Sequence, residues 1–195
     1  MTTAACWDAA ATDLPSDVQN VLEEAETPAL AKLKLLAALP QWETSLPGGD
    51  RPSCTDVLAI TRSEHGLAVL AVEAKVNEPF GPTVGEKRVK ASPGQAERLA
   101  YLETVLDVSV SFSDHVRYQL LHRTASAVLT AQQFHAATAV LLIHSFSSTA
   151  KWRDDFETFC LAMGAESISP NVRRVPHFSN PALYLVWCPG DLRFL

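Results

Sequence analysis

Apolar residues follow helical spacing at the start of the chain, and continuous apolar runs come after it. Between residues 16 and 25 the apolar positions lie three or four residues apart behind Ser16 and Gln19, a capping-box pair, which predicts a helix. The same spacing behind Thr27-Pro28 predicts a second helix over residues 30–37, ended by Pro40. The glycine- and proline-rich residues 46–52 then predict a loop.

Two apolar runs, residues 55–62 and 67–76, are predicted to pair as a β-hairpin because only a short segment ending in glycine separates them. Both faces of each run are largely apolar, so the hairpin is expected in the middle of a sheet with helices against it. A turn at residues 63–66 places Arg62 opposite Leu67 and, by the same register, Asp56 opposite Glu73.

The rest of the chain alternates between the two patterns. We expect a long ordered loop over residues 77–90, followed by a helix over residues 92–106 that is capped by Ser92 and Gln95. A second helix is expected over residues 115–134 and a buried strand over residues 137–146. A third helix over residues 152–163 and a last strand over residues 182–188 complete the chain. This order predicts one α/β domain over residues 1–195, with a mixed sheet flanked by helices. Residues 1–50 form its acidic helical part, and residues 51–195 form the core and a C-terminal decoration.

Composition narrows the class of protein. The 195 residues are 47% hydrophobic and 19% charged, which is typical of a globular chain. The net charge of −6 lies within residues 1–50, which hold two basic and eight acidic residues. This balance excludes a non-specific nucleic-acid coat, but a local basic groove stays open. No apolar run approaches the roughly 18 residues of a membrane helix, so no membrane partner is expected.

The four cysteines lie far apart in the sequence, with no Cys-x-x-Cys pair, at Cys6, Cys54, Cys160 and Cys188. Their spacing indicates neither a structural zinc site nor a disulfide framework. We therefore expect a reducing, cytoplasmic setting, and the N-terminus has no pattern of a secretory signal.

The predicted hairpin carries the candidate chemistry. Directly opposed side chains in an antiparallel pair have Cβ atoms about 4.5–5.5 Å apart, and Lys75 shares the face of Glu73. Two opposed carboxylates, Asp56 and Glu73, repel each other unless cations compensate them. Lys75 can neutralise one of them and Mg²⁺, or Mn²⁺ as a substitute, the other. The alternative is a structural ion triad at the solvated end of the hairpin.

Asp56 followed by Glu73-Ala74-Lys75 resembles the Asp…(Asp/Glu)-x-Lys signature of the PD-(D/E)XK nuclease superfamily, and the predicted element order is similar to its core. The resemblance implies a restriction-endonuclease-like fold with the motif on a central antiparallel hairpin. It also implies that Asp56, Glu73 and the Ala74 carbonyl bind metal and that Lys75 is the catalytic lysine. The implied activity is Mg²⁺-dependent hydrolysis of nucleic-acid phosphodiesters, with DNA as the expected substrate. Residues 73–82 and 117–123 also resemble bacterial proteins without an assigned activity.

Some features depart from that family's pattern or leave alternatives. No proline directly precedes Asp56, and the glutamate that the family often adds from its first helix is either Glu23 or Glu24. A catalytically inactive nuclease fold acting as a binding or assembly module is one alternative, and a small-nucleotide hydrolase is another. The acidic N-terminal helices leave a homodimer or a protein partner open.

Further candidates follow the hairpin. One face of the helix over residues 115–134 carries Gln119, His122, Arg123 and Ser126. In the related nucleases such a helix presents a glutamine or a basic residue to the scissile phosphate. Gln119 is therefore a candidate catalytic residue and Arg123 a candidate phosphate ligand, against the alternative of a solvated helix face.

The loop after Lys75 and the helix behind it add basic residues that are candidates for phosphate contacts, namely Lys87, Arg88, Lys90 and Arg98. Phe80 either stacks on a base or returns to the core, and we favour the core. His144 lies in a predicted buried strand, so we expect a hydrogen-bonded core histidine and not a ligand. Ser53 and Cys54 lie beside Asp56 but lack a nearby histidine–aspartate partner set, which argues against nucleophilic catalysis.

Overall fold

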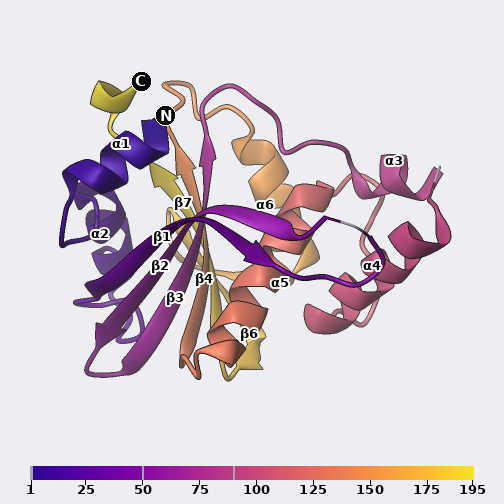
Figure 1. Ribbon diagram of the computed structural model, residues 1–195, viewed down its shortest axis with the longest axis horizontal. Helices are drawn as coiled ribbons and strands as arrows, with labels where there is room; N and C mark the ends of the chain where they lie inside the picture. Colours follow the sequence, from indigo (N-terminus) through magenta and orange to yellow (C-terminus); the bar gives the residue numbers. More distant parts are fainter. Residues whose placement is uncertain (1, 50, 90) are drawn as a thin grey trace.

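Seven strands form one mixed sheet in the computed structural model, which describes residues 2–49, 51–89 and 91–195 (Figure 1). The strand order is β1-β2-β3-β4-β7-β6-β5. The strands are β1 (Lys34–Thr44), β2 (Ser53–Ser63), β3 (Gly66–Lys75), β4 (Thr138–Ser145), β5 (Glu166–Ser169), β6 (Val172–Ser179) and β7 (Ala182–Pro189). Strands β3, β4 and β7 run parallel, while the outer pairs on both sides are antiparallel.

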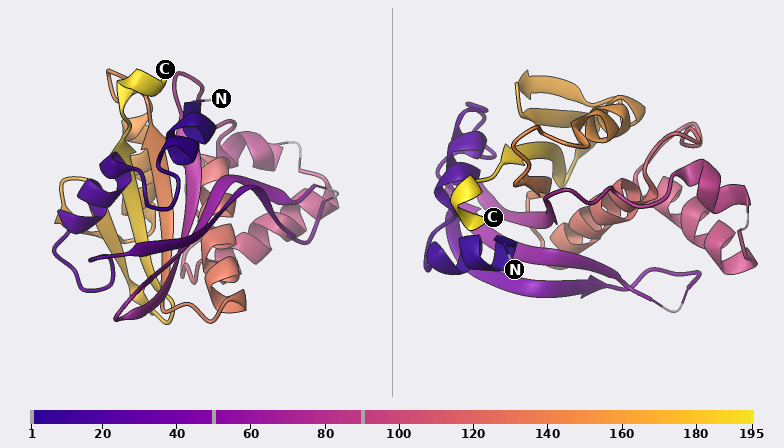
Figure 2. Two further views of the ribbon diagram at one scale, coloured as in Figure 1. Left: turned by 60° about the vertical axis from the view of Figure 1, so that its left-hand side comes forward. Right: turned by 90° about the horizontal axis from the view of Figure 1, so that it is seen from above.

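Helices cover both faces of this sheet, as predicted for an α/β chain. They are α1 (Thr2–Ala9), α2 (Ser16–Glu23), α3 (Val84–Val89), α4 (Pro93–Val105), α5 (Tyr118–Gln133), α6 (Arg153–Ala162) and the short 3₁₀ helix η1 (Leu192–Phe194). One apolar cluster joins α1 and α2 to the sheet, and a second joins α5 and α6 to its other face. Helices α3 and α4 extend away from the sheet beside α5 (Figure 2).

The central hairpin forms in the predicted register. Arg62 pairs with Leu67, and the pairing continues in step to Val57 and Val72. The paired ladder ends there, one position short of Asp56 and Glu73. Strand β3 is buried along most of its length because β2 and β4 flank it and helices cover it on both faces.

The predicted second helix over residues 30–37 is wrong, because this segment enters strand β1. Leucine and alanine favour a helix locally, but backbone pairing with β2 over Lys34–Thr44 decides the outcome. Pro40 does not end a helix; it lies within β1, opposite Val57. Since β1 is an edge strand, the missing N–H of proline is tolerated there.

The other helix predictions hold with shifted ends. The capping box of Ser92 and Gln95 forms at the start of α4. That of Ser16 does not, because α2 begins behind Pro15 without a side-chain cap. Helix α5 begins at Tyr118 and not near His115. The predicted loop over residues 77–90 contains α3, while Lys90 lies outside the described residues.

No pattern in the sequence predicted α1, β5, β6 or η1. Strands β5 and β6 form the far edge of the sheet, where neither face shows a continuous apolar run. Within the part of the chain that the structure describes, no helix has the length and apolar character needed to cross a membrane.

Candidate active site

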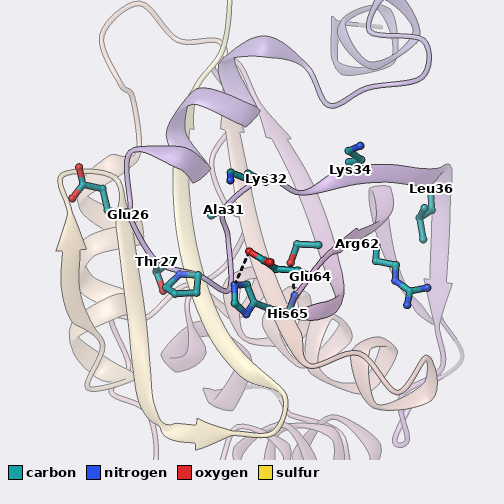
Figure 3. A pocket seen from close by; sticks show the side chains of 11 residues that line it. Glu26, Thr27, Ala31, Lys32, Lys34, Leu36, Arg62, Glu64 and His65 are labelled. Atoms are coloured by element: carbon teal, nitrogen blue, oxygen red, sulfur yellow. Dashed lines mark hydrogen bonds and ion pairs between the residues drawn. The ribbon is translucent and has the colours of Figure 1, made fainter.

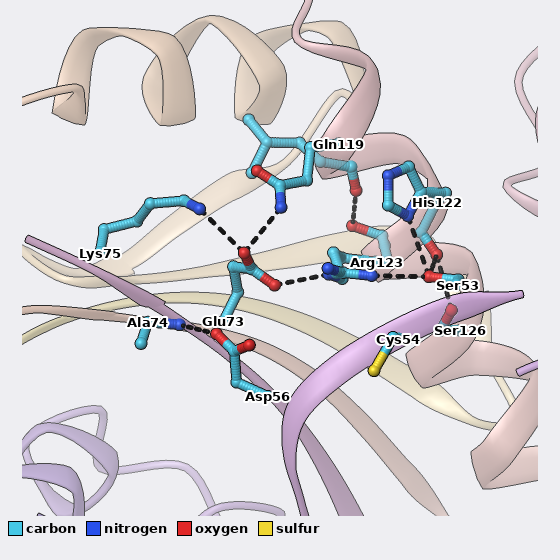
Figure 4. Close-up of polar contacts among 12 residues, drawn as sticks. Ser53, Cys54, Asp56, Glu73, Ala74, Lys75, Gln119, His122, Arg123 and Ser126 are labelled. Carbon is cyan, nitrogen blue, oxygen red and sulfur yellow. Dashed lines mark hydrogen bonds and ion pairs between the residues drawn. The ribbon is translucent and has the colours of Figure 1, made fainter. Parts of the chain in front are cut away.

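Two strands diverge at the end of the central hairpin, and the predicted acidic and basic residues gather there (Figure 4). Glu73 and Lys75 lie near the C-terminal end of β3 on the face covered by α5, since the neighbouring Val69 and Ala71 pack into the α5 side of the core. Asp56 reaches the same place from β2. Helix α5 supplies Gln119 and Arg123 to the same place.

Glu73 is the centre of a buried ion network. Its side chain is 4% exposed, and so is that of Lys75. Glu73 Oε1 accepts hydrogen bonds from Lys75 Nζ at 2.8 Å and from Gln119 Nε2 at 2.7 Å. Glu73 Oε2 accepts one from Arg123 Nε at 2.5 Å. Both carboxylate oxygens therefore have donors, and Lys75 also lies 5.1 Å from the ring centroid of Phe80.

Asp56 lies in the opening between β2 and β3. Its Oδ2 accepts the backbone N–H of Ala74 at 2.8 Å, which takes the place of the next strand pairing. Burial raises the pKa of Asp56, and the negative charge of Glu73 adds to this, against the lowering effects of the Ala74 N–H, Arg123 and Lys75. This carboxylate is thus held beside a like charge in a position where a further cation would stabilise it.

The predicted ion triad differs from the observed network in two ways. Lys75 bonds to Glu73, but the hydrogen bonds of the described residues do not join it to Asp56. Lys75 and Glu73 are also buried and do not lie at a solvated end. The alternative of a solvated face on α5 is wrong as well, since Arg123 is buried and Gln119 points at Glu73.

Ser53 and His122 extend this network, and the sequence analysis missed their pairing. Arg123 Nη1 donates to Ser53 Oγ at 3.0 Å, and the Ser53 hydroxyl lies 2.9 Å from His122 Nδ1. The hydroxyl accepts from arginine and so can donate to an unprotonated Nδ1. Ser53 is buried and its oxygen is engaged by Arg123, so it orients the guanidinium instead of acting as a nucleophile. Residues 53 and 122 are distant in sequence, so no local motif could have linked them.

His122 stays neutral in the folded chain. Burial lowers its pKa from 6.5 to about 3, and the positive charges of Arg123, Arg98, Lys87 and Lys75 contribute to the shift. The unfolded chain binds a proton at this residue below pH 6.5 and the folded chain does not, so acidification favours unfolding.

Replacing His122 by asparagine is expected to flatten the loss of stability on acidification. At 1.36 kcal/mol per pH unit, the pKa difference would lower the free energy of unfolding of the wild type by about 2 kcal/mol between pH 6.5 and pH 5. The partial exposure of the ring reduces this expected loss to about 1 kcal/mol. Urea unfolding at pH 7.5 and pH 5 measures the difference, and His65→Asn in the β2–β3 turn controls for loss of a histidine. Parallel pH dependences of His122→Asn and the wild type would contradict this expectation.

Arg88 and Arg98, two of the predicted phosphate ligands, make hydrogen bonds within the protein instead. Arg88 donates to the Phe112 carbonyl at 2.8 Å and to Asp114 at 2.6 Å. Arg98 donates to the carbonyls of Leu46, Pro47, Gly49 and Arg51 at 2.8–3.1 Å and so fastens the loop before β2 onto α4. Lys87 lies on α3, and its Nζ is 5.3 Å from the ring centroid of Tyr118. It does not join the Glu73 network.

Other candidates also have clear positions. Phe80 is fully buried, so the preferred core position is confirmed and base stacking is wrong. Glu23 and Glu24 are exposed at the end of α2, where Glu23 accepts a hydrogen bond from Gln19, and neither joins the Glu73 network. Cys54 is half-buried with a raised pKa, caused mainly by burial, which does not suit a nucleophile.

Open pockets lie at both ends of the hairpin. A pocket of about 960 Å³ between α1, β1 and the hairpin has Asp56 and Ala74 in its wall, but Glu73 and Lys75 do not line it. A second pocket, of about 740 Å³, lies at the β2–β3 turn and is lined by Lys32, Arg62 and His65 among others (Figure 3). It contains none of the predicted site residues.

The comparisons with known proteins identify a family and assign no activity. The search of curated proteins and the search of solved structures each found no match. Residues 1–192 match the model of a family described as Domain of unknown function (DUF6946). Because the match covers nearly the whole chain, the protein belongs to the DUF6946 family.

Proposed function

We propose that this protein is a Mg²⁺-dependent nuclease that hydrolyses phosphodiester bonds in nucleic acid, with DNA as the first candidate substrate. The observation that carries the proposal is the buried network of Glu73, Lys75, Gln119 and Arg123 beside Asp56, at the point where β2 and β3 diverge. A carboxylate pair with a lysine and an arginine on one side suits a substrate that carries negative charge.

The order of elements supports the proposed restriction-endonuclease-like fold. A helix, three antiparallel strands, a helix and a further strand occur in this order as α2, β1–β3, α5 and β4, with α3 and α4 between β3 and α5. The acidic and basic residues lie on the second and third strands, and the glutamine lies on the helix after them. These are the positions that the resemblance to the PD-(D/E)XK superfamily implies for Asp56, Glu73, Lys75 and Gln119.

The donor set fits magnesium. Asp56 and Glu73 supply two carboxylates, and Mg²⁺ typically binds one or two of them together with waters and substrate phosphates. The raised pKa of Asp56, caused by burial and by the charge of Glu73, indicates an uncompensated negative charge there. Bound by Asp56, Glu73 and the Ala74 carbonyl, the ion would polarise the phosphodiester and supply a hydroxide nucleophile.

The chain's own residues then have distinct tasks. Lys75, held in place by Glu73 and packed against Phe80, positions the attacking water and stabilises charge on the phosphate oxygens. Gln119, in the first turn of α5, donates a hydrogen bond from Nε2 to Glu73 Oε1 and so holds that carboxylate in place. Arg123 donates to Glu73 through Nε and to Ser53 through Nη1, so its Nη2 group is the part of the guanidinium that can donate to a phosphate.

Cleavage assays test this function. We expect the purified chain to cut linear duplex, circular duplex or single-stranded DNA or RNA in Mg²⁺ or Mn²⁺, and not in excess chelator. Asp56→Asn is expected to lower the rate at least about 100-fold, because it removes a charged ligand of the ion. Asp107→Asn, the same change at an exposed residue after α4, serves as the matched control. Failure to cut any of these substrates, or full activity of Asp56→Asn, would count against the proposal.

One observation favours a second function, a catalytically inactive nuclease fold that acts as a binding or assembly module. Three donors already occupy the carboxylate of Glu73 within the protein, which leaves one acceptor site, on Oε2, for a metal. The exposed Glu23 and Glu24 on α2 would then offer an acidic surface to a protein partner or to a second copy. Isothermal titration with Mn²⁺ separates the two functions, since the module shows no binding that depends on Asp56. Cleavage of mononucleotides only would instead indicate a small-nucleotide hydrolase.

A further inference from the structure

Three segments that are distant in sequence bring a thiol, a carboxylate and an imidazole together on the face of the sheet opposite to Glu73. Cys6 comes from α1, Asp17 from α2 and His144 from β4. One potential ligand atom from each lies within 4.8 Å of the others, and within the described ranges this is the single group of three or more histidine, cysteine, aspartate or glutamate residues placed in this way. Cys6 and His144 are buried and Asp17 is half-buried.

His144 is held by a single polar contact among the described residues. Its Nε2 lies 3.0 Å from Asp17 Oδ2, while its Nδ1 is buried without a hydrogen-bond partner. The ring packs against Phe146, with 4.4 Å between the centroids. The expectation of a hydrogen-bonded core histidine is thus confirmed, but the hydrogen-bonding capacity of the imidazole is only half used.

Asp17 is oriented as metal-binding carboxylates are. Its Oδ2 accepts the backbone N–H of Asp191 at 2.9 Å, and its Oδ1 accepts that of Val18 at 2.8 Å. Such outer hydrogen bonds fix the direction of a ligand before an ion binds. The bond from Asp191 also joins the start of α2 to the chain that follows β7.

We propose that Cys6, Asp17 and His144 bind a zinc ion, which fastens α1 and α2 to the sheet. Thiolate and imidazole select zinc over magnesium, and zinc takes Cys, His and Asp ligands together. With bonds of about 2.1 Å and a tetrahedral angle, the nitrogen and oxygen ligands lie about 3.4 Å apart. The present 3.0 Å between His144 Nε2 and Asp17 Oδ2 therefore has to open by only a few tenths of an ångström.

The surroundings leave room for the fourth ligand. A pocket of about 230 Å³ reaches Cys6 and Asp17 from the surface between α1 and η1, with Asp191 and Arg193 in its wall. A water can complete the coordination there. Binding releases the thiol proton of Cys6 to solvent, so zinc affinity rises with pH.

The same three residue types also occur in thiol nucleophile triads, but this one is unsuited to that chemistry. Burial, with the charges of Asp17 and Asp191, raises the pKa of Cys6 to about 12, whereas a nucleophilic cysteine needs a lowered pKa. The Nε2 atom of His144 is already engaged with Asp17, so it is not free to take the proton of the thiol. Without a metal, the thiol stays protonated.

Cobalt and zinc titrations test this site independently of any nuclease activity. The wild-type chain is expected to show a thiolate-to-cobalt charge-transfer band in the near ultraviolet that corresponds to one bound Co²⁺, and one equivalent of Zn²⁺ removes this band. Cys6→Ser is expected to lose the band, and Asp17→Asn to weaken Co²⁺ binding at least about tenfold. Cys54→Ser is the matched control because Cys54 lies on β2 beside Asp56, where a thiolate would report metal in the proposed nuclease site. Zinc is expected to raise the unfolding temperature of the wild type and of Cys54→Ser, but not that of Cys6→Ser.

Two results would overturn the zinc site. One is the absence of a thiolate band in the wild-type chain at saturating Co²⁺. The other is a band that disappears in Cys54→Ser and persists in Cys6→Ser. If Cys6→Ser does not fold, the titration of the wild type and of Asp17→Asn decides, since unchanged affinity in Asp17→Asn also contradicts the site. A chain that binds zinc but cuts no nucleic acid would keep this site and lose only the proposed nuclease.

Discussion

Glu73→Gln is expected to lower the free energy of unfolding by about 3 kcal/mol, the largest change in stability that we predict for a single substitution. The amide keeps the shape of the side chain but leaves Lys75 and Arg123 buried without their anion. Removing one partner of a buried ion pair typically costs about 3–5 kcal/mol, because the remaining charge is desolvated and unpaired. Urea unfolding of wild type and variant at pH 7.5 measures the difference.

Asp155→Asn supplies the matched control for this experiment. Asp155 pairs with Arg117 at 3.0 Å, but both side chains are about one-fifth exposed, so the loss is expected to stay near 1 kcal/mol. Adding Lys75→Met to Glu73→Gln should recover part of the stability, since it removes one of the two unpaired cations. A loss below 1 kcal/mol for Glu73→Gln would show that water reaches the network and compensates its charges.

Lys75→Met is expected to slow phosphodiester cleavage at least about 100-fold, which is the typical effect of removing one group that stabilises charge in the transition state. The stability should change less than in Glu73→Gln, because Glu73 keeps Arg123 and Gln119 as donors. Single-turnover cleavage rates at saturating enzyme separate this chemical effect from weaker substrate binding.

The control for Lys75 is Lys151→Met. Lys151 also lies over an aromatic ring, 5.2 Å from the centroid of Trp152, but it is exposed at the start of α6. Its replacement should leave the cleavage rate unchanged. Equal cleavage rates for Lys75→Met and Lys151→Met would remove Lys75 from the mechanism.

The local pattern of the chain predicted the hairpin and its register. Ser63 to Gly66 is a short turn, and a fixed turn sets every opposed pair, so Arg62 opposite Leu67 followed from the sequence alone. The same holds for α4, whose capping box is a local signal. Helical spacing likewise placed Gln119 and Arg123 on one face of α5.

Local preference failed where pairing partners decided the structure. Residues 30–37 contain leucine and alanine at helical spacing, yet from Lys34 onward the backbone groups of β2 pair with the chain and hold it extended as β1. Arg88 and Arg98 carry charge that suits a phosphate, but carbonyl oxygens and acidic groups brought near by the fold engage them first. No pattern within a short stretch of sequence contains such information.

The residue pattern alone placed acidic and basic side chains on the hairpin and on α5, and so it indicated a charged cluster around Glu73. Which groups bond to one another followed from the packing of the elements: Glu73 bonds to Arg123, Ser53 to His122, and Asp17 to His144. The last pair joins residues 127 positions apart, and Cys6 meets them because α1 and α2 pack on the face of β4. Spacing along the chain records neighbours on one element, whereas contacts between elements depend on how the apolar faces of helices and sheet are buried together.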